Sequence, residues 1–491
     1  MNNWIVPGAP LEKGAGWRIW FSRGDGSTAQ PVVQKVERVK DGANAPFTVT
    51  WSPFSVPGLR RSFGIIELRL AAPQPGEIYR VYLPEARDNS ADPVREGWLE
   101  MRSLPGQLPP DGLSFLFASC FWRDDDQTGG GYSGVVQQLV RKEKPAFKLL
   151  IGDQVYQDFP AAWFSDETAL ALYNTRYEDY WGARGYQDVL RATPNFFLCD
   201  DHEFWNDYPE WQIQLARTYS EKGHREFTDA ALVLYEAYQQ SANLGGAAWQ
   251  SFTIAPVSFF IADSRSTRTY VKDSDPHFLS HDQWTALEKW FHELQGPGVL
   301  VLGQPLFQKD GDFRDHALSD FKGDYDKLHR LIVQSHSGNN AAGKPHQILI
   351  LTGDIHCGRI ARGIVAGAPP LAAEMWEFVT SPISRIAPYL KTPKPEEPRP
   401  SIDGPAQDHH PIDVDLIEDP PTRLGPGTRP TIHNNVGLVR MTPIGDGTVR
   451  FQLSLRCIRP YNHVHWWEVA VDKNSFPASY TELLRKEIVL R

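Results

Sequence analysis

Cysteine is scarce in this chain. Four residues, Cys120, Cys199, Cys357 and Cys457, are scattered over 491 positions. No two of them form a CxxC pair, which argues against both a disulfide framework and a zinc knuckle. We therefore expect free thiols, with Cys199 and Cys457 in the core. A run of about 20 apolar residues is absent as well, which argues against a membrane span.

Positive charge is also in short supply, because 50 Lys and Arg stand against 60 Asp and Glu and give a net charge of −10. A chain of this charge repels nucleic acid and anionic membranes as a whole, so nucleic acid is not expected as a general partner. An anionic substrate would be attracted locally, by bound metal or a few arginines. The first residues, MNNWIVPGAPLEKGAGW, show neither the basic nor the apolar region of a leader peptide. We expect a cytoplasmic protein, or a periplasmic or secreted one if a leader was removed; the oligomeric state has no signature in the sequence.

The composition is otherwise globular, with 41% hydrophobic and 22% charged residues. The first part has β texture from residue 17 to about 104, in alternating or β-branched runs separated by Gly, Pro and Asp, as in a small sandwich. The segment RSLPGQLPPDG (102–112) is expected to be a linker. The β runs are WRIWFSR, PFTVTWSPF, SFGIIELRLA and EIYRVYLPE.

From residue 113 onward, strands and helices are expected to alternate. Near-continuous apolar strands suit sheets that are covered on both faces. The clearest helix is SHDQWTALEKWFHELQG, where Ser280 and Gln283 have the spacing of a capping box and Gly296 follows the end. A second helix is expected at 326–334. The strands are LSFLFASC, AFKLLIGD, NFFLCDDHE, VSFFIADSR, GVLVLGQP and QILILTGDIH.

Residues 392–430 contain ten prolines among acidic residues, which excludes a helix or a central strand. Such a long stretch is usually a functional flap or a mobile excursion. Arg423 or Arg429 could reach a substrate from it, whereas His409 and His410 are expected at the surface rather than on a metal. Strands are expected to resume in VGLVRMTPI, GTVRFQLSLRC and VHWWEVAVD, with GDG as a hairpin turn.

Most of the apolar runs end in polar residues, always at their carboxyl end, which is where ligands bind in open α/β sheets. Taken singly, an aspartate at such a position most often caps a helix or forms a turn. A single cysteine there most often packs in the core, and a single histidine most often forms ordinary hydrogen bonds within the protein. Five strand ends that deliver compatible ligands to one edge favour a transition-metal centre instead. The residues concerned are Cys120; Asp153 and Tyr156; Asp200, Asp201 and His202; Asp263 and Arg265; Asp354 and His356.

The motifs GDQVYQD, DDHEFWND, DSRSTR and TGDIH, preceded by ASC, resemble in order those of PhoD-like alkaline phosphatases (the D type). These belong to the calcineurin-like metallophosphoesterase superfamily. The likeness runs from about 113 to 385, includes HDQWTALEKWF and the TSP at 380–382, and extends more weakly to the β-rich start. It implies a metallophosphoesterase-type α/β sandwich of two mixed sheets flanked by helices. An N-terminal β-sandwich domain (1–104) would precede the catalytic domain (113–491).

The resemblance also implies a dinuclear metal site, with Asp153 matching the aspartate that bridges two cations. Asp200 is a further candidate ligand whose role stays open, and Cys357 is expected to point away because it follows His356. One metal would be held by Cys120, Tyr156 and His356, and the other by Asp153, Asp201 and Asp354.

Three further residues have candidate roles toward the substrate. His202 matches the histidine that contacts the phosphoryl oxygen or the leaving group. Arg265 and Arg268 are candidates for clamping non-bridging oxygens, with a structural salt bridge to Asp263 as the alternative. The glycine-containing CGRI after GDIH replaces a larger aromatic residue expected from the family, so the pocket there is expected to differ in shape.

Thiolate and phenolate ligands favour Fe³⁺, whereas carboxylates favour a harder divalent ion such as Ca²⁺, Mg²⁺ or Mn²⁺, with Zn²⁺ also compatible. Two adjacent cations would activate a water molecule for in-line attack on a phosphate monoester or diester, a small-molecule substrate. The alternative is a non-catalytic or altered-specificity binding protein on the same scaffold that uses its β domain for recognition. Hydrolysis of non-phosphate esters is a third possibility. The complete ligand set favours the phosphoesterase.

Overall fold

The computed structural model describes residues 3–86, 97–123, 126, 130–162, 165–307, 316–356, 358–365, 368–381, 383, 412–416, 434–459 and 479–491. Several sequence predictions fall outside these ranges. They are Cys357, most of the Pro-rich segment with His409, His410, Arg423 and Arg429, and the strand expected at VHWWEVAVD.

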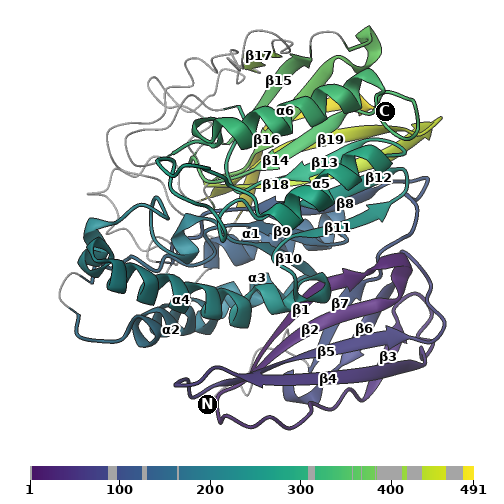
Figure 1. Ribbon diagram of the computed structural model, residues 1–491. Coiled ribbons are helices and arrows are strands. Elements are labelled where there is room, and N and C mark those ends of the chain that lie inside the picture. Colours follow the sequence, from purple (N-terminus) through teal and green to yellow (C-terminus); the bar gives the residue numbers. More distant parts are fainter. Residues whose placement is uncertain are drawn as a thin grey trace.

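The N-terminal part is a β-sandwich of two antiparallel sheets, seen in purple at the bottom of Figure 1. Their strand orders are β1-β2-β5-β4 and β3-β6-β7. Trp17, Ile19, Val81 and Leu99 are among the residues that form its core. All four predicted runs are strands. The strands are β1 (Trp4–Leu11), β2 (Gly16–Arg23), β3 (Lys35–Arg38), β4 (Phe47–Ser55), β5 (Ser62–Leu70), β6 (Ile78–Tyr82) and β7 (Trp98–Arg102).

Strand β1 lies ahead of the β region expected from residue 17, and the two prolines in WIVPGAPL explain why it was missed. The pairing with β2 shifts register between Pro7 and Pro10, so the strand accommodates them at an irregularity. The other side of β1 meets the α/β part of the chain. The Asn195 amide donates to the Pro7 carbonyl at 2.6 Å, and a Cβ on Gly8 would lie 2.4 Å from the Ala242 carbonyl oxygen. The absence of a side chain at Gly8 therefore lets the sandwich dock closely.

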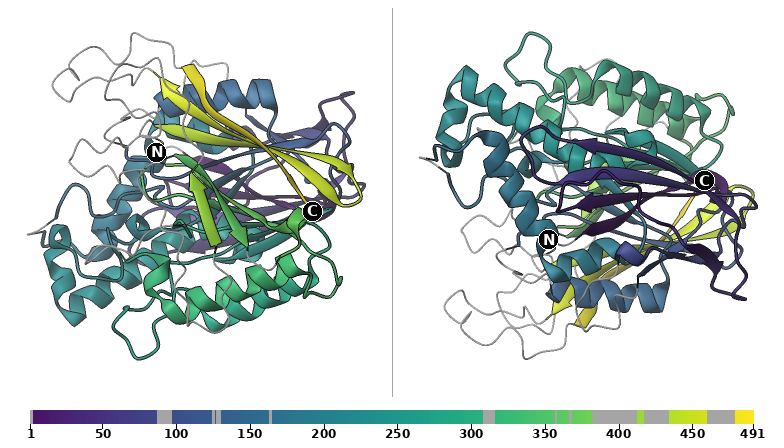
Figure 2. Two further views of the ribbon diagram at one scale, coloured as in Figure 1. Left: turned by 90° about the horizontal axis from the view of Figure 1, so that it is seen from above. Right: turned by 90° about the horizontal axis from the view of Figure 1, so that it is seen from below.

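The remainder is built on two stacked mixed sheets (Figures 1 and 2). One has the order β10-β9-β8-β18-β19-β20 and the other β11-β12-β13-β14-β16-β15-β17. The six apolar runs predicted as strands form β8, β9, β10, β12, β13 and β14, and the predicted hairpin through Asp446 and Gly447 joins β18 to β19. The strands of the two sheets are β8 (Leu113–Ala118), β9 (Lys148–Ile151), β10 (Asn195–Leu198), β11 (Gln250–Ile254), β12 (Val257–Ile261), β13 (Gly298–Val301), β14 (Ile348–Thr352), β15 (Arg359–Val365), β16 (Glu374–Val379), β17 (Ile412–Leu416), β18 (Asn435–Gly445), β19 (Thr448–Arg459) and β20 (Ser479–Leu490).

Helices cover both outer faces of this pair of sheets, so the predicted α/β sandwich is confirmed. Phe117, Leu149, Val299 and Leu351 pack between the sheets, which explains the continuous apolar strands. The opposite faces of the same strands pack against helices. The helices are α1 (Gly130–Glu143), α2 (Ala169–Gly182), α3 (Arg184–Arg191), α4 (Glu221–Tyr238), α5 (His281–Glu293) and α6 (Lys322–Ser337).

Helix α5 confirms the clearest helix prediction, although only half of its capping box forms. The Ser280 hydroxyl accepts the Gln283 backbone N–H at 3.3 Å. The Gln283 side chain does not return to the cap. It instead holds both backbone groups of Asp263, accepting from its N–H at 2.7 Å and donating to its carbonyl at 2.8 Å. The helix start is therefore tied to the end of β12.

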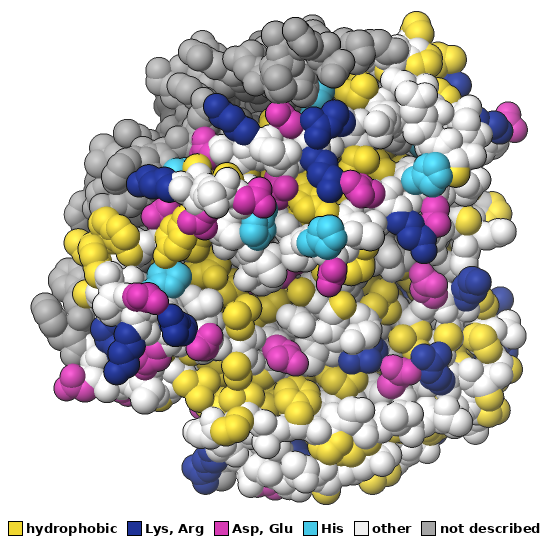
Figure 3. Space-filling model, viewed as in Figure 1, with side chains coloured by type: hydrophobic (Ala, Val, Ile, Leu, Met, Phe, Trp, Pro, Cys, Tyr) yellow, Lys and Arg dark blue, Asp and Glu magenta, His cyan; other side chains and the backbone are white. Residues whose placement is uncertain are grey.

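The face shown in Figure 3 carries basic and acidic side chains interspersed over its described area, without a broad region of one sign. In the described part of the chain, no helix is long and apolar enough to cross a membrane.

Candidate metal centre

The carboxyl ends of the parallel strands from both sheets converge at one edge, and sharp turns follow them. Cys120, Asp153, Asp354 and His356 all have φ between 50° and 65°. This left-handed conformation is uncommon for residues other than glycine and costs roughly 1–3 kcal/mol per residue. Residues with such strained backbone conformations cluster at functional sites. Gly152 lets two of the turns approach, because a Cβ there would lie 2.4 Å from the Asp200 Cβ.

The first group of possible ligands contains Cys120, Asp153 and His356, whose ligand atoms all lie within 4.8 Å of one another. The Cys120 thiol is 3.3 Å from Asp153 Oδ2. The Tyr156 hydroxyl is 3.3 Å from His356 Nε2, which adds a phenol to this side. Ser381, from the TSP motif, lies 3.1 Å from the Cys120 sulfur and accepts the His356 backbone N–H at 2.9 Å.

Two further groups follow in an overlapping series, in which the second shares Asp153 with the first and the third shares Asp201 with the second. One contains Asp153, Asp201 and His202, and the other contains Asp200, Asp201 and Asp354, each with its ligand atoms within 4.8 Å. Asp153 thus belongs to two groups and Asp201 to two. The structure therefore brings all seven predicted ligand residues to one place, in the overlapping arrangement that two neighbouring cations would need.

The charges at this site fit a cation. Asp200 Oδ2 and Asp201 Oδ1 are buried without a hydrogen-bond partner among the described residues. Burial and the neighbouring acids Asp201, Asp200 and Glu203 raise the pKa of Asp153 well above its usual range. Burial, with Asp153 and Asp354, likewise raises the pKa of the Cys120 thiol. Such a cluster is costly by itself, and a bound cation stabilises its ionised forms.

Glu203, the last residue of DDHE, joins the two central ligand loops. Its Oε2 accepts the backbone N–H groups of Asp153 and Asp200, both at 2.9 Å. Its Oε1 accepts from the Gln154 backbone at 2.7 Å and the Gln239 side chain at 3.1 Å. Burial raises the pKa of Glu203 to about 7, and these four donors oppose that shift. The glutamate therefore fixes the spacing of the loops after β9 and β10.

His202 is held in place by Asp158, the second aspartate of GDQVYQD. His202 Nδ1 lies 2.8 Å from Asp158 Oδ1, and both side chains are buried. The Tyr156 ring lies against the imidazole with centroids 4.0 Å apart. A carboxylate on one ring nitrogen fixes the tautomer and the orientation of the imidazole at the site.

The two arginines of DSRSTR are buried and engaged with protein groups. The salt bridge considered for Arg265 forms with Asp200, at 2.6 Å, rather than with Asp263. Arg265 Nη1 also donates to the Tyr208 carbonyl, which leaves Nη2 without a partner among the described residues. The carboxylate of Asp263 instead accepts the Arg265 and Ser266 backbone N–H groups, so this strand-end residue is a turn former.

Arg268 acts on the site through a relay. Its Nη2 donates to Gln304 Oε1 at 2.7 Å, and Gln304 Nε2 donates to Asp354 Oδ2 at 3.1 Å. Its Nε and Nη1 also contact carbonyl oxygens of Ser264 and His316. Contact of Arg268 with a substrate stays a prediction, because all three of its nitrogens face protein oxygens here.

Sequence reasoning missed Glu203, Asp158, Gln304, Gln239 and Ser381 as supports of the site. Glu203 and Asp158 lie within the quoted motifs, and Gln304 follows the strand run of β13, so a strand-end signal existed for it. Gln239 ends a helix far from any motif and gave no such signal.

The fold and the site together define the class. This is an α/β protein in which strand ends from two stacked sheets gather carboxylate, imidazole, thiol and phenol groups suited to binding metal. Residues 115–308 match the family model described as PhoD-like phosphatase. The chain therefore carries a PhoD-like phosphatase domain, and the family predicted from the motifs is confirmed. The match of this domain supports a phosphoesterase, a hydrolase of a metal-dependent family.

Among solved structures, the chain is similar to one titled "Structure of PhoD". The TM-score is 0.58 and the identity 16%, over 92% of this chain and 86% of that one. At this identity the likeness shows the fold alone. No curated protein sequence matches the chain.

Proposed function

We propose that the chain hydrolyses small-molecule phosphate monoesters, diesters or both by in-line attack of a water molecule at a dinuclear metal centre. The observation that carries this proposal is the overlap of the three ligand groups. Asp153 lies in the group with Cys120 and His356 and also in the group with Asp201 and His202. A shared carboxylate between two adjacent sets of ligands is what a bridged pair of cations requires.

The residues fit two different cations. Cys120, Tyr156 and His356 provide thiolate, phenolate and imidazole donors, which favour Fe³⁺. Asp200, Asp201 and Asp354 provide oxygen donors, which favour Ca²⁺, with Mg²⁺, Mn²⁺ or Zn²⁺ as substitutes. When bound, such a pair supplies Lewis acidity that polarises a phosphoryl group and acidifies a water molecule.

The chain's own side chains then bind and orient the substrate. His202, held at Nδ1 by Asp158, presents its other nitrogen to a phosphoryl or leaving-group oxygen. Arg265 orients Asp200 and has Nη2 left to meet a non-bridging oxygen. Arg268 orients Asp354 through Gln304. Phosphoryl transfer depends mainly on positioning and charge stabilisation, so these contacts supply what the reaction needs. We assign the activity to residues 113–491, with 1–104 as a separate β domain.

The test compares Asp153→Ala and His202→Ala with the wild type. We expect Asp153→Ala to lose both bound metal and hydrolysis, because it removes the shared ligand. We expect His202→Ala to keep its metal and lose mainly kcat, because this side chain acts in the transition state. Metal content by mass spectrometry and turnover of p-nitrophenyl phosphate and its bis-ester separate these effects.

Circular dichroism of each variant serves as the folding control. The proposed function would be contradicted if the wild type bound metal but hydrolysed neither ester faster than Asp153→Ala does. Loss of metal in His202→Ala would instead reassign His202 as a ligand. A panel of sulfate and carboxylate esters distinguishes phosphate specificity from a broader esterase.

A further inference from the structure

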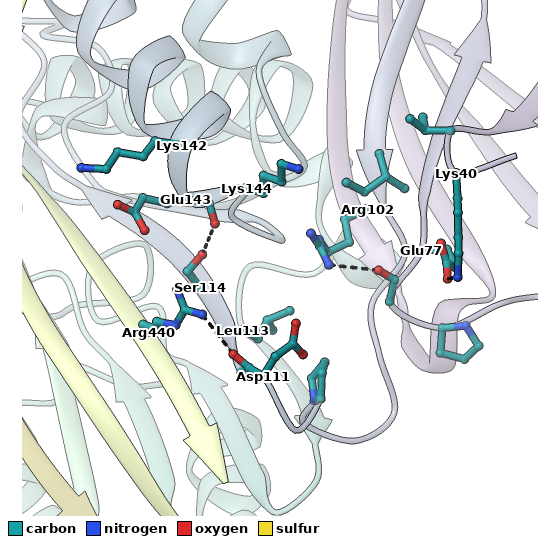
Figure 4. A pocket seen from close by; sticks show the side chains of 16 residues that line it. Lys40, Glu77, Arg102, Asp111, Leu113, Ser114, Lys142, Glu143, Lys144 and Arg440 are labelled. Atoms are coloured by element: carbon teal, nitrogen blue, oxygen red, sulfur yellow. Dashed lines mark hydrogen bonds and ion pairs between the residues drawn. The ribbon is translucent and has the colours of Figure 1, made fainter. Parts of the chain in front are cut away.

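A cavity of about 720 Å³ lies between the N-terminal β-sandwich and the α/β part, away from the metal centre (Figure 4). The sandwich contributes β6, β7, the turn before β6 and the segment that follows β3. The α/β part contributes the start of β8, the end of α1 and β18. The linker that carries Pro109 and Asp111 borders it. Its volume is in the range of small-molecule sites, roughly 300–1,000 Å³.

Basic side chains outnumber acidic ones around this cavity. Figure 4 shows Arg102 and Lys40 on one side and the other three basic residues across from them. This local excess of positive charge occurs in a chain whose net charge is −10. The basic residues are Lys40, Arg102, Lys142, Lys144 and Arg440, and the acidic ones are Glu77, Asp111 and Glu143.

The acids of the cavity leave several of these cations unneutralised. Glu77 forms an ion pair with Lys40 at 3.7 Å. Among the described residues, no carboxylate lies within ion-pair distance of Arg102, Lys144 or Arg440. Arg440 donates to the backbone carbonyl of Asp111 at 3.0 Å. The positive charge is therefore available to a ligand.

Of these three residues, Arg102 is the strongest evidence for an anion site, because its side chain is half-buried. Its Nη1 donates to the Gly76 carbonyl at 3.1 Å, and its Nε is buried without a partner among the described residues. Burial lowers the pKa of this guanidinium, with Asp111 and Glu77 opposing the shift from a distance. Holding a half-buried arginine on neutral acceptors alone is unfavourable, and a bound anion would remove that cost.

We propose that this cavity binds a small multivalent anion that carries phosphate or carboxylate groups. The planar guanidinium of Arg102 suits paired anionic oxygens, while Lys144 and Arg440 supply charge from the opposite wall. The ligand bridges the β-sandwich and the α/β part and stabilises their contact.

The cavity is distinct from the metal centre. Leu113 and Ser114 line it at the start of β8, whereas Cys120 follows the other end of that strand. Six residues of strand separate the two sites by about 20 Å. Binding here therefore requires neither the metal ligands nor turnover.

The experiment is a calorimetric titration of the full chain with inorganic phosphate and, separately, with tricarballylate. Each cavity substitution is made both in the metal-loaded wild type and in Asp153→Ala, because in Asp153→Ala the metal centre no longer competes for the anions. The first probe represents phosphate groups and the second carboxylates. We expect saturable binding of at least one probe that weakens as salt is added. Binding should weaken by about tenfold or more in Lys144→Gln and Arg440→Gln, two exposed positions whose substitution spares the core. Arg102→Gln should have the largest effect.

Two controls make the result specific. Lys289→Gln removes the same charge from an exposed position on α5 and should bind as the wild type does. Asp153→Ala should keep the cavity's binding, and the cavity variants should keep wild-type hydrolysis. Absence of saturable binding up to about 10 mM, equal affinity in the cavity variants, or loss of binding in Asp153→Ala would each overturn the proposal.

Discussion

At the scale of single residues, Glu203 connects the two loops that carry most of the candidate ligands. Its carboxylate is fully buried and accepts four N–H groups, two of them from the backbones of Asp153 and Asp200. Because all four partners are donors, only a group that accepts at both oxygens can satisfy them. The residue therefore holds the backbones of the two loops in place through its hydrogen bonds.

We expect Glu203→Gln to loosen the metal centre. The amide keeps the volume but turns an NH₂ group toward at least one backbone donor, and a buried donor left unsatisfied costs about 1–3 kcal/mol. The free energy of unfolding should fall by that amount and metal affinity by about tenfold or more, measured by urea denaturation and competitive chelation. Glu12→Gln, at an exposed position in the β-sandwich, is the matched control. Unchanged metal affinity in Glu203→Gln would show that Glu203 does not position the ligands.

The ligands themselves could be predicted from the sequence because each follows an apolar strand, and that signal is local. The supporting roles of Glu203, Gln239 and Gln304 were missed, because these residues act through contacts with residues distant in the chain, and their own positions in the sequence do not indicate such contacts. The same limit explains Arg265, whose partner Asp200 lies 65 positions away while the expected Asp263 lies two away.

At the scale of elements, His336 ties helix α6 to strand β14. Its Nδ1 lies 2.6 Å from the Ala372 carbonyl, and its Nε2 accepts the Ile348 backbone N–H at 3.1 Å. This pair of bonds requires the neutral ring with its proton on Nδ1. Burial lowers the pKa of His336 to about 4, and the Ala372 carbonyl opposes the shift only partly.

A pH dependence of stability follows from the neutral His336. The folded pKa of about 4 lies below the unfolded value near 6.5, so between them the unfolded chain binds more protons. The contribution is complete above pH 6.5 and is lost as the pH falls toward 4, at up to about 1.4 kcal/mol per pH unit. Urea unfolding across this range should show a shallower slope in His336→Gln than in the wild type. His292→Gln, exposed on α5, should keep the wild-type slope, and equal slopes in all three proteins would contradict the assignment.

Elements with strong periodicity or caps were predictable, as α5 and the six strands of the two sheets show. The capping box of α5 forms only in part, because the Gln283 side chain binds the backbone of Asp263 instead of the backbone N–H of Ser280. Strand β1 was missed because its prolines hide a strand whose stability comes from docking on the α/β part.

At the scale of the whole molecule, the metal centre concentrates negative charge at the edge where both sheets meet. Asp153, Asp200, Asp201 and Glu203 are all buried there, and Arg265 forms an ion pair with Asp200. The two sheets, several helices and the loops between them contribute to this edge. The stability of the folded chain should therefore depend on what neutralises the cluster.

Removal of metal should accordingly lower the melting temperature of the entire chain. A ligand that binds only the folded state at a thousandfold excess over its Kd stabilises it by about 4 kcal/mol, and a chelator removes that contribution. Differential scanning calorimetry with and without chelator should show a shift of several degrees that is reversed when Fe³⁺ and Ca²⁺ are restored. In Asp153→Asn, which lacks the shared ligand, the chelator should change little. A wild-type melting temperature that is the same with and without metal would mean that the acidic cluster is stable alone, because the buried carboxylates would then be held protonated or by their hydrogen bonds.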